Sequence, residues 1–466
     1  MIPLYSSQAI REWDAQLIVQ GFPSHTLMEL AGKGVADFLH RKYPHASIAI
    51  YCGSGNNGGD GYVLARWLHL WGHNVALCSV SPPKTTDSIC NAQLYKGPSY
   101  ELLSMPDCDI TIDALLGTGQ DRPPSTLYAE AVQEINLQKN RGSVVYALDI
   151  PTGIHPDLGY PLGDDWVEVD GCFSFGKSKE SLFRNADMGE IIEIDIGFDL
   201  LPHPPLAHSF LLEQRDIINW WPKESSSMAK WNRGHVAIIA RGGAAVLAAQ
   251  GAFVMGAGLV SVVCSESDWN MMHGMPPEVM RTDKLDIHRH DSVVLGPGIT
   301  EFDDFCSLWN HFPKPMVVDA GGLSLLAQQK PPLSEHIRVL TPHSAEAARL
   351  LGTTKSDVEK DTLGTTQKLQ SFGFSLLKGP YTKIGSYPMW IAPRGSVRLA
   401  TAGSGDILVG LIGALLAKGL SAPRAAAIAC YLHATSGEQM KYFETASDLI
   451  QRLRETINCT KSNSML

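Results

Sequence analysis

Two glycine-rich segments stand before helical patterns and carry residues that could bind a phosphorylated ligand. The first, Gly-Ser-Gly-Asn-Asn-Gly-Gly-Asp-Gly at residues 53–61, follows an apolar run that predicts a strand. Gly53, Gly55 and Gly58 fit the G-x-G-x-x-G pattern of strand–turn–helix dinucleotide sites. Because glycines permit positive φ angles and close backbone approach, the amides and the helix N-terminus can face a pyrophosphate. The segment predicts a phosphate-binding loop, with a merely flexible loop as the alternative.

The second segment, Leu-Ala-Thr-Ala-Gly-Ser-Gly-Asp at residues 399–406, precedes an apolar helical pattern near the end of the chain. Gly403 and Gly405 at a helix N-terminus would form another anion cradle. Asp406 falls in the first helical turn, where a carboxylate also interacts favourably with the helix dipole. Beside a phosphate, that carboxylate can activate a hydroxyl group for phosphoryl transfer. The segment therefore predicts a phosphoryl-transfer site.

Carboxylates end two predicted strands in the first half. Asp113 precedes Ala-Leu-Leu-Gly-Thr-Gly, and Asp149 precedes Ile-Pro-Thr-Gly. Because the carboxyl ends of parallel strands border the crevice that binds ligands, we expect both to join the glycine loop, although either could cap a turn. Their oxygens and those of nearby Asn and Thr suit a group I or II cation, and there is no His/Cys cluster for a transition metal. The strand after the loop ends without an acidic residue for a ribose, which disfavours a standard dehydrogenase.

Strand ends in the second half carry further candidates. Val-Leu-Thr-Pro-His at residues 339–343 places His343 after a strand, with Glu346 one helical turn later. Leu-Lys-Gly-Pro-Tyr-Thr at residues 377–382 offers a lysine, a glycine and a hydroxyl group for nucleotide phosphates, and Leu-Gly-Pro-Gly at residues 295–298 is a tight turn. A lone histidine such as His343 is more often a capping residue, so its assignment depends on the neighbouring motifs.

The elements that must position these residues alternate between apolar strands and amphipathic helices. This alternation predicts parallel sheets covered by helices on both faces. In the first half we expect helices at 7–19, 26–41, 62–71 and 127–137, and strands at 48–52, 75–80, 110–115 and 144–150. In the second half we expect strands at 236–240, 259–264, 292–295, 316–319, 338–340 and 375–377, and helices at 244–255, 407–416 and 425–438.

Length and composition set the domain count and exclude several classes. A chain of 466 residues exceeds the size of one core, and the proline-rich residues 201–207 predict a linker between domains at 1–205 and 210–466. The net charge of −10 without a Lys/Arg block argues against nucleic-acid and membrane partners. Residues 244–264 are uncharged, but Gly256 and Gly258 divide them into a helix and a strand rather than a membrane span. Nine cysteines without a C-x-x-C pair and no signal-peptide pattern indicate a cytoplasmic protein.

The motifs of the first half, with Leu-Met-Glu-Leu-Ala-Gly at residues 27–32, closely resemble the NAD(P)HX epimerase domain, a Rossmann-like three-layer fold. That family interconverts the R and S epimers of hydrated NAD(P)H, which requires proton transfer through ring opening or reversible loss of hydroxide. The resemblance implies that Asp149 contacts the substrate and is the candidate acid–base residue. The other implied substrate contacts are Asn56, Asn57, Gly58, Gly59, Asp60, Gly117, Thr118, Gly119, Gln120, Asp121, Arg122 and Pro123, and the implied K⁺ ligands are Asn57, Asp113 and Thr152.

The second half, over most of residues 210–458, resembles the ribokinase-like ADP/ATP-dependent NAD(P)HX dehydratases. The resemblance implies Mg²⁺ where phosphates transfer. The implied substrate contacts are Ala244, Gly298, His343 and the base Asp406; the implied nucleotide contacts are Lys378, Gly379, Pro380, Tyr381, Thr382 and Gly405. This chain departs from the family in a shorter loop at residues 240–243 and in Gly321, where the family commonly has a second aspartate.

The sequence as a whole is thus interpreted as a two-domain nicotinamide-nucleotide repair enzyme. The first domain epimerises NAD(P)HX, and the second dehydrates the S form to NAD(P)H with ADP or ATP, since phosphorylation makes the hydroxyl a good leaving group. The alternatives are a ribokinase-like small-metabolite kinase and an epimerase whose degraded second domain binds nucleotide for regulation. Family analogy also allows a homo-oligomer, and it leaves open ADP against ATP and NADHX against NADPHX.

Overall fold

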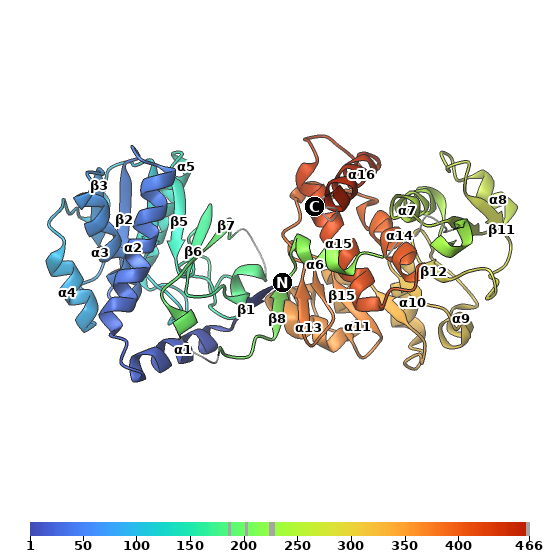
Figure 1. Ribbon diagram of the computed structural model, residues 1–466, viewed down its shortest axis with the longest axis horizontal. Helices are drawn as coiled ribbons and strands as arrows, with labels where there is room; N and C mark the ends of the chain where they lie inside the picture. The colour runs from blue at the N-terminus through green and yellow to red at the C-terminus, as the bar shows by residue number, and fades with distance from the viewer. Residues whose placement is uncertain (185–187, 201–203, 223–228, 463–466) are drawn as a thin grey trace. The chain divides into compact units, whose positions relative to one another are not determined.

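A computed structural model shows two compact α/β units, each built on its own sheet (Figure 1). The first unit is Pro3–His208, and the second joins Met1–Ile2 to Ser209–Leu466. The structure describes residues 1–184, 188–200, 204–222 and 229–462, so residues 201–203 of the predicted linker lie outside the described residues. The predicted α/β class is confirmed.

The first unit has an all-parallel sheet in the order β3-β2-β4-β5-β6-β7. Every residue of β2 is buried, as expected of a parallel strand covered on both faces. Helix α3 packs against β2, β3 and β4, and α5 packs against β4 and β5. The strands are β2 (Ile48–Cys52), β3 (Val75–Ser79), β4 (Ile110–Ala114), β5 (Val144–Leu148), β6 (Gly171–Phe175) and β7 (Glu190–Ile194); the helices are α1 (Ser7–Val19), α2 (Ser24–Lys42), α3 (Asn56–Leu70), α4 (Thr86–Leu94) and α5 (Thr126–Asn140).

The second unit has a mixed sheet whose strands follow the order β8-β17-β16-β15-β14-β13-β12-β9-β10-β11. The strands from β15 to β11 are parallel, and β16 is antiparallel to both of its neighbours. These strands are β8 (Ser209–Leu211), β9 (His235–Ile239), β10 (Leu259–Val263), β11 (Met280–Thr282), β12 (Ser292–Leu295), β13 (Met316–Val318), β14 (Arg338–Leu340), β15 (Phe374–Leu377), β16 (Lys383–Ile384) and β17 (Met389–Ile391); β1 (Ile2–Leu4) opens the chain.

Helices cover both faces of this second sheet. One face packs on α7, α14, α15 and α16, and the other on α9, α10 and α11. The helices of the unit are α6 (Gln214–Trp220), α7 (Gly242–Val254), α8 (Glu266–Asn270), α9 (Phe305–His311), α10 (Gly321–Gln329), α11 (Ser344–Leu351), α12 (Lys355–Lys360), α13 (Thr362–Leu369), α14 (Ser404–Ala417), α15 (Ala422–Gln439) and α16 (Ala446–Ser462).

The uncharged stretch of residues 244–264 forms a core helix, α7, followed by β10, as predicted. Helix α7 packs tightly on α14, and glycines make the contact possible. A Cβ on Gly251 would overlap the carbonyl oxygen of Ile407, and one on Gly410 would overlap that of Ala248. Within the described part of the chain, no helix has both the length and the apolarity to cross a bilayer.

Both sheets contain a switch point, where the chain leaves one strand for neighbours on opposite sides. In the first unit this strand is β2, which lies between β3 and β4; in the second it is β9, which lies between β10 and β12. Open α/β sheets bind ligands at the carboxyl ends of strands at such a point. The glycine loop at residues 53–61 follows β2, and the short loop at residues 240–243 follows β9.

Candidate active sites at the two sheet switch points

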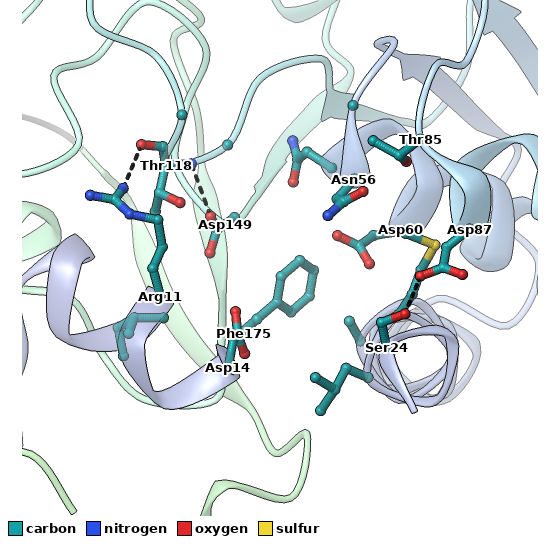
Figure 2. Close-up of a pocket in the computed structure, with 18 of the residues that line it drawn as sticks. Arg11, Asp14, Ser24, Asn56, Asp60, Thr85, Asp87, Thr118, Asp149 and Phe175 are labelled. Carbon is teal, nitrogen blue, oxygen red and sulfur yellow. Dashed lines mark hydrogen bonds between the residues drawn. The ribbon is translucent and has the colours of Figure 1, made fainter. Parts of the chain in front are cut away.

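A cavity of about 560 Å³ lies at the carboxyl ends of β2, β4 and β5 in the first unit (Figure 2). Gly58, Gly59, Asp121, Arg122 and Pro123 are not among the residues that line it. The predicted site residues that do line it are Asn56, Asn57, Asp60, Gly117, Thr118, Gly119, Gln120 and Asp149. The structure thus brings three separate strand-to-helix connections to one cavity.

The glycine loop reaches this cavity in a different way from the one predicted. Helix α3 begins at Asn56, inside the loop, and none of the glycines at residues 53–61 has a positive φ angle. Instead, a Cβ on Gly58 would overlap the carbonyl oxygen of Gly53, and one on Gly61 would lie 2.7 Å from the Cβ of Ala114. The glycines therefore let the helix N-terminus approach the sheet closely, where its free N–H groups can face an anion.

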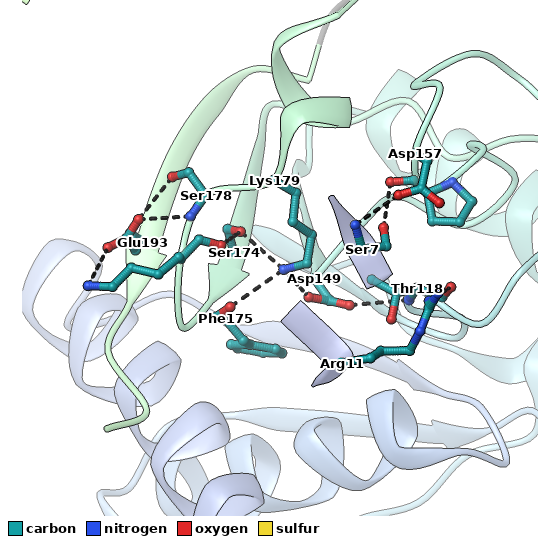
Figure 3. Close-up of polar contacts among 12 residues, drawn as sticks. Ser7, Arg11, Thr118, Asp149, Asp157, Ser174, Phe175, Ser178, Lys179 and Glu193 are labelled. Atoms are coloured by element: carbon teal, nitrogen blue, oxygen red, sulfur yellow. Dashed lines mark hydrogen bonds and ion pairs between the residues drawn. The ribbon is translucent and has the colours of Figure 1, made fainter. Parts of the chain in front are cut away.

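Asp149 is held in place by a buried lysine (Figure 3). Its Oδ1 lies 2.6 Å from Nζ of Lys179, whose side chain is 1% exposed, and its Oδ2 accepts a hydrogen bond from the Thr118 N–H at 3.2 Å. Asp149 also has a φ of 68°, a left-handed conformation that aspartate and asparagine tolerate better than most residues. The carboxylate is thus fixed at the cavity wall with its charge compensated from behind.

Two other aspartates of this cavity have no such compensation. Burial raises the pKa of Asp14 to about 6, and the nearby Asp149 charge adds to this shift while Lys179 opposes it. Burial also raises the pKa of Asp60 well above its usual range, again with a contribution from the Asp149 and Asp14 charges. Perturbed carboxyl groups that share a cavity are candidates for acid–base chemistry.

The three predicted K⁺ ligands lie in the same region of the first unit. Asp113 is fully buried; its oxygens accept hydrogen bonds from the Thr152 N–H at 2.7 Å, the Thr152 hydroxyl at 2.8 Å and the Leu115 N–H at 3.0 Å. Burial still raises the pKa of Asp113 to about 6. The side-chain amide of Asn57 is buried and has no hydrogen-bond partner in the structure. An orphaned amide and a buried carboxylate are what a cation would satisfy.

In the second unit, Asp406 lies beside Lys378 and Asp319 at the N-terminus of α14. Nζ of Lys378 is 2.7 Å from Asp319 Oδ1, and a Cβ on Gly405 would lie 3.5 Å from the same Nζ. Burial raises the pKa of Asp406 to about 6, with the Asp319 charge adding to the shift and Lys378 opposing it. Although burial opposes it, the carboxylates of Asp319 and Glu346 raise the pKa of Lys378. A lysine and several carboxylates thus meet at this anion cradle.

His343 follows β14 and is the N-cap residue of α11. Its Nδ1 accepts the Ala345 N–H at 3.1 Å, and Glu346 accepts the His343 N–H in a capping box. The His343 side chain is 54% exposed, and its other ring nitrogen, Nε2, lies 3.6 Å from Glu346 Oε2. The residues after β14 and after β15 lie side by side here, because the Lys378 N–H donates to Pro342 O at 2.8 Å.

The remaining predicted contacts of the second unit divide into two groups. Gly298, with a φ of 70°, lies against the backbone of Arg241, just before Ala244 in the first turn of α7. The segment Gly379, Pro380 and Thr382 turns between β15 and β16, while the Tyr381 side chain is buried. Where the family commonly has a second aspartate, a Cβ on Gly321 would overlap the carbonyl oxygen of Ile299, so this chain has no room for that side chain.

Sequence reasoning did not assign roles to Asp14, Lys179, Asp319 or His433. Lys179 follows β6, a strand that the alternation pattern missed, and Asp14 is one polar residue of an amphipathic helix. His433 on α15 donates through Nε2 to Ser404 O at 3.0 Å, and burial lowers its pKa to about 4, which keeps the imidazole neutral. Of these four residues, only Asp319, the last residue of the strand predicted at residues 316–319, had a position that could have indicated a site.

Comparison with known proteins identifies relatives for both halves of the chain. A family model described as NAD(P)H-hydrate dehydratase matches residues 238–459, and one described as the YjeF-related protein N-terminus matches residues 24–181. The bifunctional NAD(P)H-hydrate repair enzyme Nnr of Coxiella burnetii is 31% identical, over 98% of this chain and 100% of its own length. The Escherichia coli enzyme of the same name is 30% identical, over 94% and 91%. The chain belongs to the family of bifunctional NAD(P)H-hydrate repair enzymes.

A solved structure also resembles the second unit. It is an ADP/ATP-dependent NAD(P)H-hydrate dehydratase from Bacillus subtilis, co-crystallized with ATP and Mg²⁺, and it is 24% identical. The match covers 53% of this chain and 97% of that chain, with a TM-score of 0.49.

The Lys179–Asp149 pair generates a stability prediction. Lys179→Met leaves the Asp149 carboxylate, which is 14% exposed, without its cation, and we expect a loss of about 3–5 kcal/mol in the free energy of unfolding of the first unit. Lys177→Met is the matched control, because Lys177 pairs with the exposed Asp199 at 3.0 Å and should cost at most about 1 kcal/mol. Urea unfolding of both variants measures the difference; equal costs would contradict the assignment.

Proposed function

We propose that the first unit epimerises hydrated NAD(P)H and that the second dehydrates its S form with an adenine nucleotide. In this proposal residues 1–205 form the epimerase domain and residues 210–466 the dehydratase domain. The supporting observation is that each unit carries a perturbed carboxyl group at its own switch point, Asp14 beside Asp149 in one and Asp406 in the other. The relatives are named bifunctional NAD(P)H-hydrate repair enzymes, and the family model that matches residues 238–459 is described as NAD(P)H-hydrate dehydratase.

The second unit has the groups that phosphoryl transfer requires. Asp406 takes the proton of the substrate hydroxyl, whose oxygen bonds to the terminal phosphorus of the nucleotide as the shortened nucleotide leaves. The C–O bond then breaks, and phosphate leaves with its electron pair. The neighbouring carbon loses a proton to solvent, and the electrons of that C–H bond form the double bond of NAD(P)H. Lys378, Gly379, Pro380, Tyr381, Thr382 and Gly405 hold the nucleotide, and Ala244, Gly298 and His343 hold the substrate.

Mg²⁺ fits this site through the nucleotide. The carboxylates of Asp319 and Glu346 provide hard oxygen ligands at the end of the site that carries Lys378. No group of three or more His, Cys, Asp or Glu side chains among the described residues is arranged to hold a metal ion by itself. The ion would therefore arrive bound to the phosphates and would neutralise their charge during transfer.

K⁺ fits the first unit at Asn57, Asp113 and Thr152. The unpartnered Asn57 amide and the buried Asp113 carboxylate provide oxygen donors, and a single carboxylate suits a monovalent ion better than Mg²⁺. Such an ion would compensate the charge of Asp113 and hold the loop that carries Gly117 and Thr118 against the start of α3.

One assay tests the function and separates it from its alternatives. A mixture of R- and S-NADHX is incubated with ADP or with ATP, and the absorbance of NADH is followed. Complete conversion of both epimers supports two activities. A stable phosphorylated product would indicate a small-metabolite kinase, and nucleotide binding without turnover would indicate a regulatory second domain.

We also propose a cytoplasmic location and small-molecule partners only. All nine cysteines, each within the described residues, are free, which agrees with a reducing compartment. Size-exclusion chromatography with light scattering decides between a monomer and the homo-oligomer that family analogy allows.

Asp149→Asn should reduce epimerisation by about 10²-fold or more, because asparagine cannot accept a proton. Asparagine keeps the shape, the acceptor for the Thr118 N–H and tolerance of the left-handed backbone. Dehydration of purified S-NADHX should stay within about twofold of wild type, since Asp406 lies in the other unit. Loss of both activities in a folded variant would contradict two independent sites.

Asp406→Asn should reduce dehydration of S-NADHX by about 10²-fold or more while adenine-nucleotide binding persists. In the wild type, kcat/KM should rise with pH through about 6, because Asp406 must be ionised to accept a proton and its pKa is raised. The variant should lack this limb. A change smaller than about threefold would reduce Asp406 to a helix-dipole residue.

Replacing Na⁺ by K⁺ at constant ionic strength should raise the wild-type epimerase rate. Asp113→Ala should abolish the K⁺ effect and raise KM, because it removes the charged ligand. Asp107→Ala is the control: it removes a carboxylate that is 69% exposed before the start of β4, and K⁺ activation should remain. A wild-type rate that is indifferent to K⁺ would show that the site binds no functional cation.

A further inference from the structure

We propose that Asp14 on α1 is the proton donor of the first-unit site and works opposite Asp149, the proton acceptor whose carboxylate is paired with Lys179. The inference deepens the proposed epimerase function and rests on it. It concerns a residue outside the glycine loop and outside the strand ends, on a helix that precedes the first strand of the sheet.

The side chain of Asp14 lines the same cavity as Asp149 and Asp60 (Figure 2). Its Oδ1 is buried and has no hydrogen-bond partner in the structure, and the residue forms no ion pair with a described residue. The opposite side of α1 is anchored, because Trp13 and Leu17 are buried in the core of the unit. A rigid helix thus holds an unpartnered carboxyl group at the cavity wall.

Among the described residues, Asp149 is the one carboxyl group of this cavity that forms an ion pair with a cation. Nζ of Lys179 is 2.6 Å from Asp149 Oδ1 and also donates to Ser174 Oγ at 3.2 Å and to Phe175 O at 3.5 Å (Figure 3). Lys179 does not line the cavity, so it supports Asp149 from behind. These three contacts use all three N–H groups of the Lys179 ammonium, so none is left to donate a hydrogen bond to Asp14.

None of the other described charged groups that line the cavity around Asp14 forms an ion pair with it. Arg11, one turn earlier on α1, donates to Thr118 O at 3.1 Å instead of pairing with Asp14. Asp60 on α3 and Asp149 are acidic as well, so neither can neutralise a charge on Asp14; burial and the Asp149 charge raise the pKa of Asp14 to about 6. A carboxyl group without a cation that faces one paired with a lysine can form an acid–base pair with it.

The remaining aspartates of the cavity have other roles. Burial raises the pKa of Asp60 well above its usual range, and the Asp149 and Asp14 charges add to this shift, so we assign Asp60 to substrate binding. Asp87 accepts a hydrogen bond from the Ser24 hydroxyl at 2.7 Å. Among the aspartates that line the cavity, Asp14 is thus the one with a buried side-chain oxygen that has no hydrogen-bond partner in the structure.

The chemistry of a hydrated nicotinamide ring requires such a pair. Asp149 takes the proton of the hydroxyl on the carbon that inverts, a carbonyl forms, and the bond from that carbon to the ring nitrogen breaks. The nitrogen receives the bonding electron pair and takes a proton from Asp14. After rotation of the free carbonyl, the reverse steps close the ring on the other face and restore both carboxyl groups.

The test is the pH profile of epimerisation, measured by chromatography of R- and S-NADHX with the uncatalysed rate subtracted. Wild-type kcat/KM should fall as pH rises through about 6, since Asp14 must carry a proton. Asp14→Asn should lose about 10²-fold or more in kcat and lack this limb, while Asp14→Glu regains part of both. Glu12→Gln, on the exposed side of the same helix, should match wild type. Asp60→Asn should change KM and keep the limb.

Several outcomes would overturn the proposal. Asp14→Asn with a rate within about threefold of wild type and an unchanged limb removes Asp14 from the chemistry. Loss of the limb in Asp60→Asn, with Asp14→Asn active, moves the donor to Asp60. Failure to fold is excluded by unfolding curves and by NADHX binding within about threefold of wild type. A wild type without any epimerase activity would instead refute the proposed function.

Discussion

A carboxylate removed from water must be compensated by a cation, by hydrogen bonds or by a bound proton, and the first unit uses all of these means within one site. Asp149 has the ammonium group of Lys179, and Asp113 has the hydrogen bonds from Thr152 and Leu115. Asp14 has no ion pair with a described residue and no hydrogen bond to its buried Oδ1, and burial raises its pKa to about 6, which makes protonation easier. The division of labour among these aspartates follows from what lies behind each one.

The second unit meets the same constraint with a different fold topology. The charge of Asp319 is compensated by Lys378, whereas burial raises the pKa of Asp406, in the first turn of α14. In both sheets the relevant loops meet because the chain leaves the central strand in opposite directions, which opens a crevice at the strand ends. Two separate sheets thus place a lysine-paired aspartate next to an aspartate without a cation of its own.

Much of this arrangement could be predicted from the sequence, and the limits have physical causes. Buried parallel strands such as β2, β12 and β14 are short apolar runs, so their bounds were predicted residue for residue. The edge strand β7 contains Glu190 and Glu193 and was missed, as was β6, so Lys179 had no predicted position. The glycines of the first loop were recognised, but their reason is contact with the sheet rather than backbone conformation. A partner such as Lys179 for Asp149 arises only from the folded sheet.

The glycine contact between α7 and α14 has a consequence for engineering this chain. Replacing helical glycines by alanine is a standard route to thermostability, because it restricts the unfolded chain. At Gly251 and Gly410 this substitution would not stabilise the protein, because the added methyl group would overlap the backbone of the opposite helix. Helix α14 carries Asp406 in its first turn, so a displacement of the helix would also move this carboxyl group, the proposed base of the second unit. Substitutions intended to raise the thermostability of this unit therefore belong on the solvent side of its helices, away from the contact between α7 and α14 that positions Asp406.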